Sequence, residues 1–173
     1  KMAESYNEVQ LHNLPSKACT FTAEADGNFP EYNYPADFRL TLKRGAQVMF
    51  IRNDNNGRYY NGRIGHVTHI DNEKILVLCP GDDKEIEVQQ ETWENTKYSL
   101  NEKTKQIEAE VQGTFKQYPL RLAWAITIHK SQGLTFEHAI IDAQSSFAAG
   151  QVYVALSRCK TLEGLILASP ISS

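Results

Sequence analysis

The sequence predicts an α/β fold that is interrupted by a small antiparallel β-barrel, and three observations support this prediction. The C-terminal third alternates strand-like and helix-like apolar runs, an order that favours a parallel sheet. The middle of the chain switches to short strand-like runs at close spacing, which is typical of a small barrel. The total length of 173 residues suits one domain with a small insertion.

The N-terminal segment combines a helix, an extended run and a loop. Residues 5–14 place apolar side chains at roughly helical spacing, and Pro15 stops this helix because proline lacks a backbone donor. Residues 18–23 have the character of an extended strand. Residues 26–37 are rich in Gly, Asn and Pro, which indicates a loop.

The central segment, residues 39–117, carries the strand signals of the predicted barrel. Turn residues such as Asp, Asn and Gly separate its apolar runs. The strand-like runs cover residues 47–51, 63–70, 74–79, 84–89 and 106–111. Gly45, Gly62 and Gly65 suit the bulges and corners that a small barrel needs.

The last segment returns to alternating strands and helices. Residues 120–128 alternate like a strand, and residues 129–132 have the pattern of one helical turn. Two short buried strands, at 139–142 and 165–168, flank a helix at 150–158. Polar motifs follow apolar elements here, and this is where an α/β sheet places its ligand chemistry.

Composition and charge narrow the class of protein. The 41% of hydrophobic and 23% of charged residues are typical of a soluble globular protein. The net charge of −3 provides no overall basic surface for nucleic acid, so any such contact needs a local site. No apolar stretch is long enough to span a membrane, so no membrane partner is predicted.

The three cysteines, Cys19, Cys79 and Cys159, lie far apart and show no C-x-x-C spacing. Neither a zinc site nor a disulfide framework is therefore predicted. We expect reduced thiols in a cytoplasmic protein. The sequence predicts no metal-ligating residues and no catalytic triad.

Arg158 follows an apolar helix and precedes a polar turn. From this position its planar guanidinium could reach a phosphate and stabilise the charge that develops on a transferred γ-phosphoryl group. The alternative is a surface arginine that caps the carbonyls at the end of the helix. Position in the sequence leaves both interpretations open.

Residues 127–133 gather two hydroxyls, an imidazole, an ammonium, an amide and a glycine at a strand-to-turn junction. Such groups suit the phosphates and sugars of single-stranded nucleic acid. Gly133 allows the backbone to approach a ligand closely. The alternative is a polar turn in which His129 is merely hydrogen-bonded.

Tyr59 and Tyr60 lie beside Arg58 and Arg63 in the central segment. Two aromatic rings among cations could stack on bases. Ordinary packing inside the barrel is the alternative.

Several strings resemble the Pif-like and RecD-like DNA helicases of superfamily 1B. Thr-x-His-Lys-Ser-Gln-Gly at 127–133 is similar to their motif V, and Tyr-Val-Ala-Leu-Ser-Arg at 153–158 is similar to motif VI. Three further strings resemble the start of the barrel that Pif-like enzymes insert: Tyr34-Pro-Ala-Asp-Phe38, Leu42-Lys-Arg-Gly-Ala-Gln-Val-Met49 and Asn61-Gly-Arg-Ile-Gly65.

This resemblance implies a fold with two parts. Residues 1–38 and 118–173 would form the second RecA-like helicase domain (2A), of the P-loop NTPase type. Residues 39–117 would form an inserted SH3-like β-barrel (2B).

The resemblance also implies a function, that of a C-terminal fragment of an ATP-dependent 5′-to-3′ DNA helicase. The implied DNA-contacting residues are Thr127, His129, Lys130 and Ser131. The implied nucleotide-binding residues are Gln132, Gly133, Gln151 and Arg158. Among them, Arg158 is the implied catalytic residue, an arginine finger that reaches the γ-phosphate of ATP.

The implied cofactors, ATP and Mg²⁺, belong to the full-length parent. No string in the chain matches G-x-x-x-x-G-K-[ST], the loop that cradles phosphates. The chain alone would therefore bind neither cofactor and would not hydrolyse ATP. The implied partners are single-stranded DNA and the missing N-terminal RecA-like domain of the same polypeptide. The alternative is a stand-alone nucleic-acid-binding or protein-binding module without motor activity.

Overall fold

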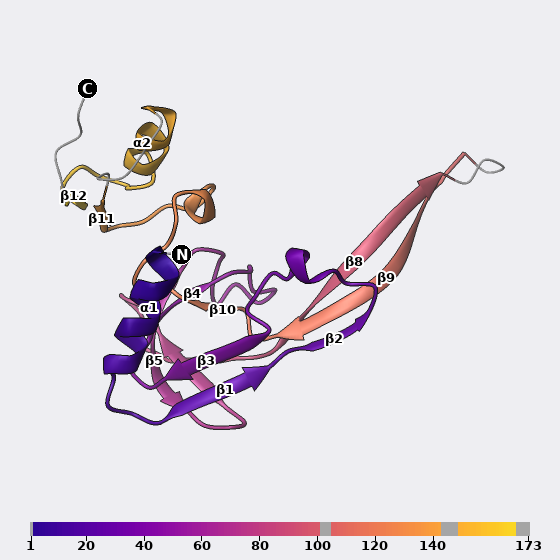
Figure 1. Cartoon of the computed structure of the whole chain (residues 1–173), viewed down its shortest axis with the longest axis horizontal. Helices are drawn as coiled ribbons and strands as arrows, with labels where there is room; N and C mark the ends of the chain where they lie inside the picture. Colours follow the sequence, from indigo (N-terminus) through magenta and orange to yellow (C-terminus); the bar gives the residue numbers. More distant parts are fainter. Residues whose placement is uncertain (1, 101–104, 143–148, 169–173) are drawn as a thin grey trace. The chain divides into compact units, whose positions relative to one another are not determined.

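The computed structural model describes residues 2–100, 105–142 and 149–168, and the chain divides into two compact units (Figure 1). The first unit combines residues 1–7 with residues 124–173, and the second holds the contiguous residues 8–123. Parts of both predicted domains fall on positions outside the described residues. The predicted boundaries after residues 38 and 117 stay a prediction.

Helix α1 (Met2–Asn13) opens the chain, and its C-terminal end belongs to the second unit. Lys43 Nζ donates hydrogen bonds to the carbonyls of His12 (3.2 Å) and Leu14 (2.8 Å). A helix end leaves such carbonyls without intrahelical partners, and a cation there also complements the helix dipole. Pro15 follows, so the helix stops where the sequence predicts.

Five antiparallel strands form the main sheet of the second unit. In spatial order they are β10 (Leu120–Leu122), β4 (Gln47–Phe50), β5 (Ile64–Ile70), β6 (Ile75–Leu78) and β7 (Ile86–Val88). Alternate side chains of β6, Ile75 and Val77, are fully buried. Gly65 of β5 is required by this packing, because a Cβ there would lie 2.5 Å from Val77 Cγ1.

This sheet is open, with β10 at one edge and β7 at the other, so the predicted closed barrel is not confirmed. The predicted glycine corners are present: Gly45 and Gly62 have φ angles of 90° and 93°. Strand β5 carries a bulge between Val67 and His69, which bends it locally.

Strand β10 ends at Leu122, whereas the apolar alternation predicted a strand as far as Ile128. The contacts between this segment and β4 end at Ala123. The N–H of Ala123 donates to Gln47 O (3.0 Å), and its carbonyl accepts from Gln47 Nε2 (2.8 Å). Beyond this point the chain enters the first unit. There residues 124–128 are all half-buried and belong to no strand, so the apolar alternation of the sequence is not matched by alternate burial.

A second sheet contains a long hairpin of β8 (Glu91–Leu100) and β9 (Ile107–Gln117), with β2 (Glu24–Gly27) on the other side of β9. Beyond its pairing with β2, the hairpin extends away from the other strands of its unit (Figure 1). Near its base Phe115 is fully buried against Ala23 and Ala36. Strand β8 was not predicted, because its polar and apolar residues show no sustained alternation.

Strands β1 (Ala18–Thr22) and β3 (Arg39–Lys43) form an antiparallel pair, and β2 and the 3₁₀ helix Glu31–Asn33 lie between them in sequence. The fully buried amide of Gln117 joins this region to the end of β9. Gln117 Nε2 donates to Phe21 O at 3.0 Å and lies 3.2 Å from Asp37 O, and Gln117 Oε1 accepts from Tyr118 N at 2.9 Å.

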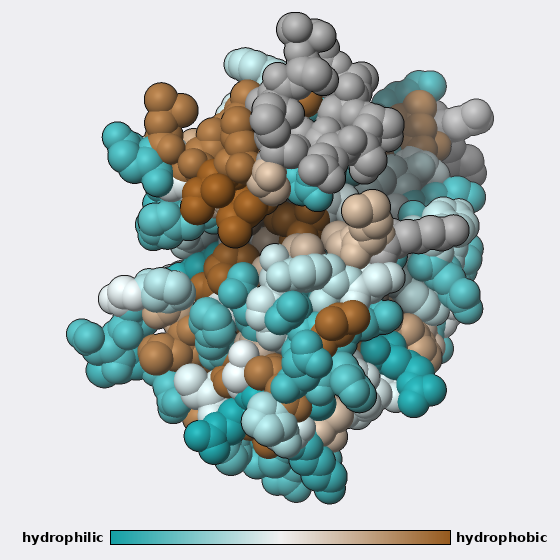
Figure 2. Space-filling view, turned by 60° about the vertical axis from the view of Figure 1, so that its left-hand side comes forward, coloured by the Kyte–Doolittle hydropathy of each residue, from teal (hydrophilic) through white to brown (hydrophobic). Residues whose placement is uncertain are grey.

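The first unit contains the predicted parallel strands. Strand β11 (Ala139–Ile141) pairs in parallel with β12 (Leu165–Leu167), and α2 (Ala149–Leu156) lies between them in sequence. Ile140 and Ile166 remain 72% and 59% exposed on this small sheet. Hydrophobic side chains gather in one region of the face drawn in Figure 2, and elsewhere on it they are mixed with hydrophilic ones.

The mixed α/β class is therefore confirmed. Across the described ranges, 2–100, 105–142 and 149–168, no helix combines the length and apolar character needed to cross a membrane.

Gln117→Met is expected to lower the free energy of unfolding by about 2–3 kcal/mol, because it leaves buried carbonyl and N–H groups without a partner. Urea unfolding followed by circular dichroism measures this. Gln106→Met is the matched control, since Gln106 is exposed. A loss no larger than that of the control would contradict the structural role of Gln117.

The carboxyl group of Asp54 is expected to make the stability of the fold depend on pH in the acid range. Asp54 has a side chain that is 3% exposed, and the hydrogen bond from Arg58 lowers its pKa from 3.8 to about 2. Because the folded-state pKa is depressed, Asp54 stabilises the fold above its unfolded pKa of 3.8, and this contribution is lost as pH falls through about 2.

Asp54→Asn is therefore expected to make the unfolding free energy less pH-dependent between about pH 4.5 and pH 2.5, by at most about 2 kcal/mol. Asp83→Asn, which removes an exposed carboxyl group at a turn, is the matched control. Equal slopes for both variants would show that the Asp54–Arg58 pair does not govern this acid response.

Candidate nucleic-acid and nucleotide site

The predicted site residues lie in the first unit, and Asn7 fixes the start of their segment. Asn7 Nδ2 donates to Ala125 O, and Ala125 N donates to Asn7 Oδ1, both at 2.8 Å. Asn7 is only 7% exposed, so this amide pair is shielded from water. The two bonds hold the backbone two residues before Thr127 against α1.

The segment 127–133 forms a tight turn around the 3₁₀ helix η2 (His129–Ser131). Ser131 N donates to the carbonyls of Thr127 and Ile128 at 3.1 Å, and Ser131 Oγ donates to Ile128 O at 2.7 Å. Ser131 is 5% exposed, so its hydroxyl stabilises the turn from inside. Gly133 closes the turn with a φ of 77°, a conformation that favours glycine.

The other predicted DNA-contacting side chains differ in what they offer. His129 is exposed, and its ring has no partner within the described residues. Lys130 is exposed and forms a long ion pair with Glu4, with 3.6 Å between Nζ and Oε1. Thr127 Oγ1 accepts a weak hydrogen bond from Lys130 N at 3.4 Å. His129 and Lys130 are therefore the side chains most available to a ligand.

Arg158 follows α2 and is half-buried. Its Nε donates to Val154 O at 3.1 Å, and its Nη1 donates to Leu134 O at 3.4 Å. Its Nη2 lies 3.1 Å from Ser157 Oγ, and Ser157 Oγ donates to Val154 O at 2.9 Å. The guanidinium thus caps the helix, and it also contacts the residue that follows Gly133.

Backbone hydrogen bonds join the segment that follows the first motif to the end of the second motif. Phe136 N donates to Arg158 O at 2.8 Å, and Lys160 N donates to Phe136 O at 2.9 Å. Phe136 and Cys159 form an isolated parallel bridge. A displacement of the chain after Gly133 therefore acts on the backbone that carries Arg158.

The remaining two side chains predicted to bind nucleotide, those of Gln151 and Gln132, are placed differently relative to Arg158. Gln151 lies near the start of α2, about 10 Å along the helix axis from the position of Arg158. Gln132 is exposed next to Gly133. The structure therefore brings Gln132, Gly133 and Arg158 into one region around Leu134, and it separates Gln151 from Arg158 by two helical turns.

Local sequence reasoning did not identify Asn7, Ser157 or the carbonyl of Leu134 as parts of this site. Asn7 and Ala125 are 118 positions apart, and a backbone carbonyl has no sequence signature, so no local pattern could reveal them. Ser157 sits inside the motif and could have been noticed as the neighbour of Arg158.

The tyrosines of the central segment have different environments. Tyr59 is 2% exposed and stacks on Phe50 with ring centroids 4.0 Å apart, so it packs in the core rather than on a base. Tyr60 is 54% exposed, with the Arg63 guanidinium 5.8 Å from its ring centre. No group of three or more His, Cys, Asp or Glu side chains suited to a metal occurs in the part of the chain that the structure describes.

Comparison with known proteins identifies relatives of this chain. The profile of the UvrD-like helicase C-terminal domain family matches residues 122–166. ATP-dependent DNA helicase Pif1 of Bdellovibrio bacteriovorus is 39% identical over 170 residues, which cover 95% of this chain and 36% of the relative. ATP-dependent DNA helicase PIF1 of Homo sapiens is 37% identical over 171 residues, covering 92% of this chain and 24% of the relative.

Solved structures of Pif1 from Bacteroides sp. are also similar to this chain. The unliganded form has a TM-score of 0.91 and is 41% identical, covering 99% of this chain and 39% of the solved chain. The form in complex with ADP-AlF4 has a TM-score of 0.89, and the form bound to ssDNA has a TM-score of 0.75, with the same identity and coverage.

The chain thus spans between about a quarter and two fifths of the length of these proteins. The matching family profile covers the strings at 127–133 and 153–158, and the relatives match nearly all of the chain. The chain therefore belongs to the Pif1-like helicases of superfamily 1B and corresponds to their C-terminal part.

Proposed function

We propose that the chain is the C-terminal part of an ATP-dependent 5′-to-3′ DNA helicase, in which it couples a single-stranded DNA contact to ATP hydrolysis. The observation that carries this proposal is the hydrogen bonding between the segment just after the first motif and the end of the second, from Phe136 to Arg158 and from Lys160 to Phe136. The Bacteroides relative has been solved bound to ssDNA and in complex with ADP-AlF4, which supports both ligands.

The proposed domain arrangement places the second RecA-like domain at residues 1–38 and 118–173 and an SH3-like domain at 39–117. It is supported by the shared unit of N-terminal and C-terminal residues, with a contiguous unit of short antiparallel strands between them. The boundaries of the proposed domains and of the compact units differ, since α1 and β1 lie partly or wholly in the second unit.

At the proposed DNA contact, Thr127, His129 and Lys130 supply a hydroxyl, an imidazole and an ammonium to the phosphates and sugars of a single strand. The exposure of His129 and Lys130 supports this role. Ser131 acts by shaping the turn, because its hydroxyl is engaged by Ile128 O.

At the proposed nucleotide contact, Arg158 stabilises the charge on the transferred γ-phosphoryl group, and Gln132, Gly133 and Gln151 support the nucleotide side of the cleft. Arg158 and the neighbouring N–H groups fit a phosphate, because they are hydrogen-bond donors. Mg²⁺, when bound in the parent, neutralises phosphate charge. Its carboxylate ligand and the phosphate-loop lysine belong to the first RecA-like domain, the proposed partner in the same polypeptide.

The guanidinium of Arg158 has five N–H donors, and its contacts with Val154 O, Leu134 O and Ser157 Oγ involve three of them. One side chain can therefore cap the helix and donate to a phosphate. Ser157, which contacts both the guanidinium and Val154 O, is a positioning residue for it.

In the full-length parent, Arg158→Ala is expected to lower kcat for ATP hydrolysis on the order of 10³-fold or more, with ATP binding nearly unchanged. Steady-state phosphate release and a nucleotide-binding titration measure the two effects. Arg39→Ala is the control, because Arg39 is exposed and has no ion-pair partner within the described residues. A near-normal kcat for Arg158→Ala would leave Arg158 with a helix-capping role alone.

The 173-residue chain is expected to bind single-stranded DNA weakly, with a slope of log affinity against log salt of about −1 to −3, because few phosphates can be neutralised. His129→Ala should weaken binding further and leave the melting temperature unchanged, since the ring is exposed. Fluorescence anisotropy with a labelled oligonucleotide measures both.

His138→Ala is the control for this experiment, since it removes an exposed histidine of the same unit that lies outside the turn. Salt-insensitive binding that survives the loss of His129 would place the DNA contact away from the turn.

A further inference from the structure

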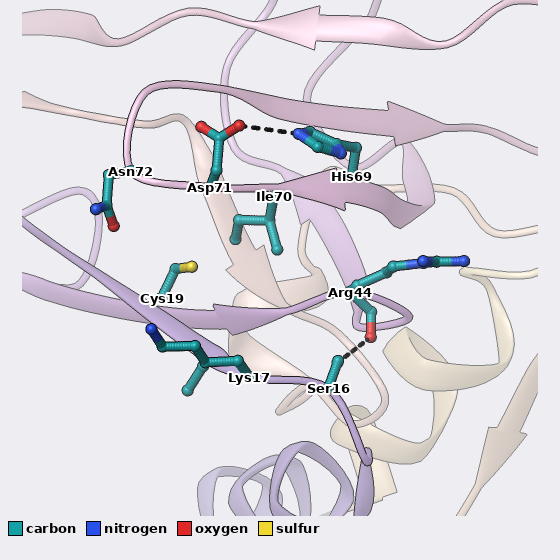
Figure 3. Close-up of a pocket in the computed structure, with 9 residues that line it drawn as sticks. Ser16, Lys17, Cys19, Arg44, His69, Ile70, Asp71 and Asn72 are labelled. Carbon is teal, nitrogen blue, oxygen red and sulfur yellow. Dashed lines mark hydrogen bonds and ion pairs between the residues drawn. The ribbon is translucent and has the colours of Figure 1, made fainter.

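A pocket of about 400 Å³ in the second unit carries charges of both signs (Figure 3). The Lys17 and Arg44 side chains extend in opposite directions there, and Asp71 Oδ2 lies 2.9 Å from His69 Nε2. Charges that diverge and differ in sign favour no single class of ligand. The hairpin of β8 and β9, by contrast, carries its apolar and charged side chains in a regular order along one face.

The outer part of this hairpin, the arm, consists of residues 96–100 and 105–111. Strand β2 pairs with β9 only from Gly113 to Lys116, so beyond Gly113 the described arm has two strands. Figure 1 shows the arm extending away from the other strands of its unit. A two-stranded hairpin is at best marginally stable in water unless another element packs against it. We therefore expect the arm to have a partner.

One face of the arm is apolar. Residues that lie directly opposite each other in an antiparallel pair share a face, and successive rows alternate between the two faces. The face of interest contains the rows Leu100–Ile107, Tyr98–Ala109 and Thr96–Val111. Its large apolar side chains are exposed to solvent: Tyr98 70%, Leu100 58%, Ile107 73% and Val111 49%. The other face carries the polar side chains of Lys97, Ser99, Glu108 and Glu110. A contiguous exposed apolar patch marks an interaction site.

The apolar face lies on the side of the sheet opposite to the core of the second unit. On β8, Trp93 packs against the core cluster around Phe115, and the alternation of the strand puts Tyr98 on the other side. On β9, a bulge places Gln112 outside the register with β8, which shifts Val111 to the same side as Tyr98. The core of this unit therefore cannot cover the apolar face, and its partner comes from elsewhere.

Opposite charges flank the middle row of the arm, Tyr98–Ala109, at equal spacing in sequence. Glu94 precedes Tyr98 by four residues on the same face of β8, toward the base, and Lys105 precedes Ala109 by four residues, toward the tip. At about 3.3 Å per residue, each charge lies at most about 13 Å from this row. Both side chains are exposed, and neither forms an ion pair within the described residues.

We propose that the arm is a docking surface for a second copy of this chain, with the two arms packed face to face and antiparallel across a two-fold axis at the middle row. The tip-side row Leu100–Ile107 of each copy then packs on the base-side row Thr96–Val111 of the other. The same patch serves both copies, as a two-fold interface requires. This surface does not use Arg158 or the turn at residues 127–133, so the proposal does not rest on the proposed function.

The charges of the arm favour this occupant and this orientation. Antiparallel arms place Lys105 of each copy opposite Glu94 of the other, whereas parallel arms would bring like charges together. Asp26 shares the row of Glu94 through Thr114, so the base of this face is acidic and disfavours the phosphates of a nucleic acid. The apolar patch is smaller than the roughly 800 Å² that each partner buries in a standard interface, so we expect a weak dimer.

Sedimentation equilibrium of the 173-residue chain, without DNA and between about 10 μM and 1 mM, tests the dimer. We expect a monomer–dimer equilibrium with a Kd on the order of 100 μM. A mass that stays at that of the monomer over the whole range would overturn the proposal. A mass that rises beyond that of the dimer would overturn it as well, because a two-fold interface is closed.

Leu100→Ser combined with Ile107→Ser is expected to raise the Kd at least about tenfold, since each lost apolar contact occurs twice in a symmetric interface. The matched control combines Leu162→Ser with Ile140→Ser, which removes a Leu and an Ile that are 83% and 72% exposed in the first unit. The control should dimerise as the unchanged chain does. Circular dichroism verifies that both variants fold. An equal effect of the two variants would count against the arm as the interface and overturn the proposal.

A charge exchange tests the orientation without touching the apolar patch. Glu94→Lys and Lys105→Glu each place like charges opposite each other, and each should raise the Kd about three- to tenfold. The two substitutions combined leave the net charge unchanged and restore opposite charges between antiparallel arms, so the Kd should return to within about twofold of its original value. Lys97→Glu, on the polar face, is the control and should leave the Kd unchanged. Losses that add in the combined variant would overturn the proposal.

Discussion

The amide pair between Asn7 and Ala125 is the interaction on which the candidate site depends. It joins the first turns of α1 to the backbone that leads into the turn at residues 127–133. The amide of Asn7 is buried and has both bonds made, and a buried hydrogen-bonding group that loses its partner costs about 1–3 kcal/mol. The turn is short and held by a few local bonds, so its position is set from outside by this pair.

The Asn7–Ala125 pair fixes the turn at residues 127–133, and further hydrogen bonds connect the end of this turn to Arg158. The turn ends at Gly133, the next carbonyl accepts from Arg158, and Phe136 shares two backbone hydrogen bonds with the segment at 158–160. Under the proposed function, a phosphate accepts from the same guanidinium that donates to Val154 O and Leu134 O. A phosphate can accept two parallel N–H bonds from a guanidinium, which makes it a better partner than a single carbonyl oxygen.

Local patterns predicted the features that are local. The end of α1 at Pro15, the glycine corners at Gly45 and Gly62, and the parallel strands on either side of α2 all follow from residues close in sequence. The alternation at Trp124, Ile126 and Ile128 predicted a strand that is absent, and residues 124–128 are all half-buried without alternation. Strand β8 was not predicted, because its pairing with β9 and not its own sequence pattern defines it. The Asn7–Ala125 pair joins distant segments, so no local sequence pattern contains it.

The discontinuity of the first unit has a consequence for how the chain folds. The second unit is contiguous, and both of its ends are fastened near the turn between β3 and β4, His12 to Lys43 and Ala123 to Gln47. Closing a loop of more than a hundred residues for a single contact has an entropic cost, and non-local contacts slow folding. If the second unit folds first, it brings residues 7 and 125 within a short tether of each other. The first unit then forms by a nearly local encounter, so mutations that slow folding of the second unit should delay the appearance of the first.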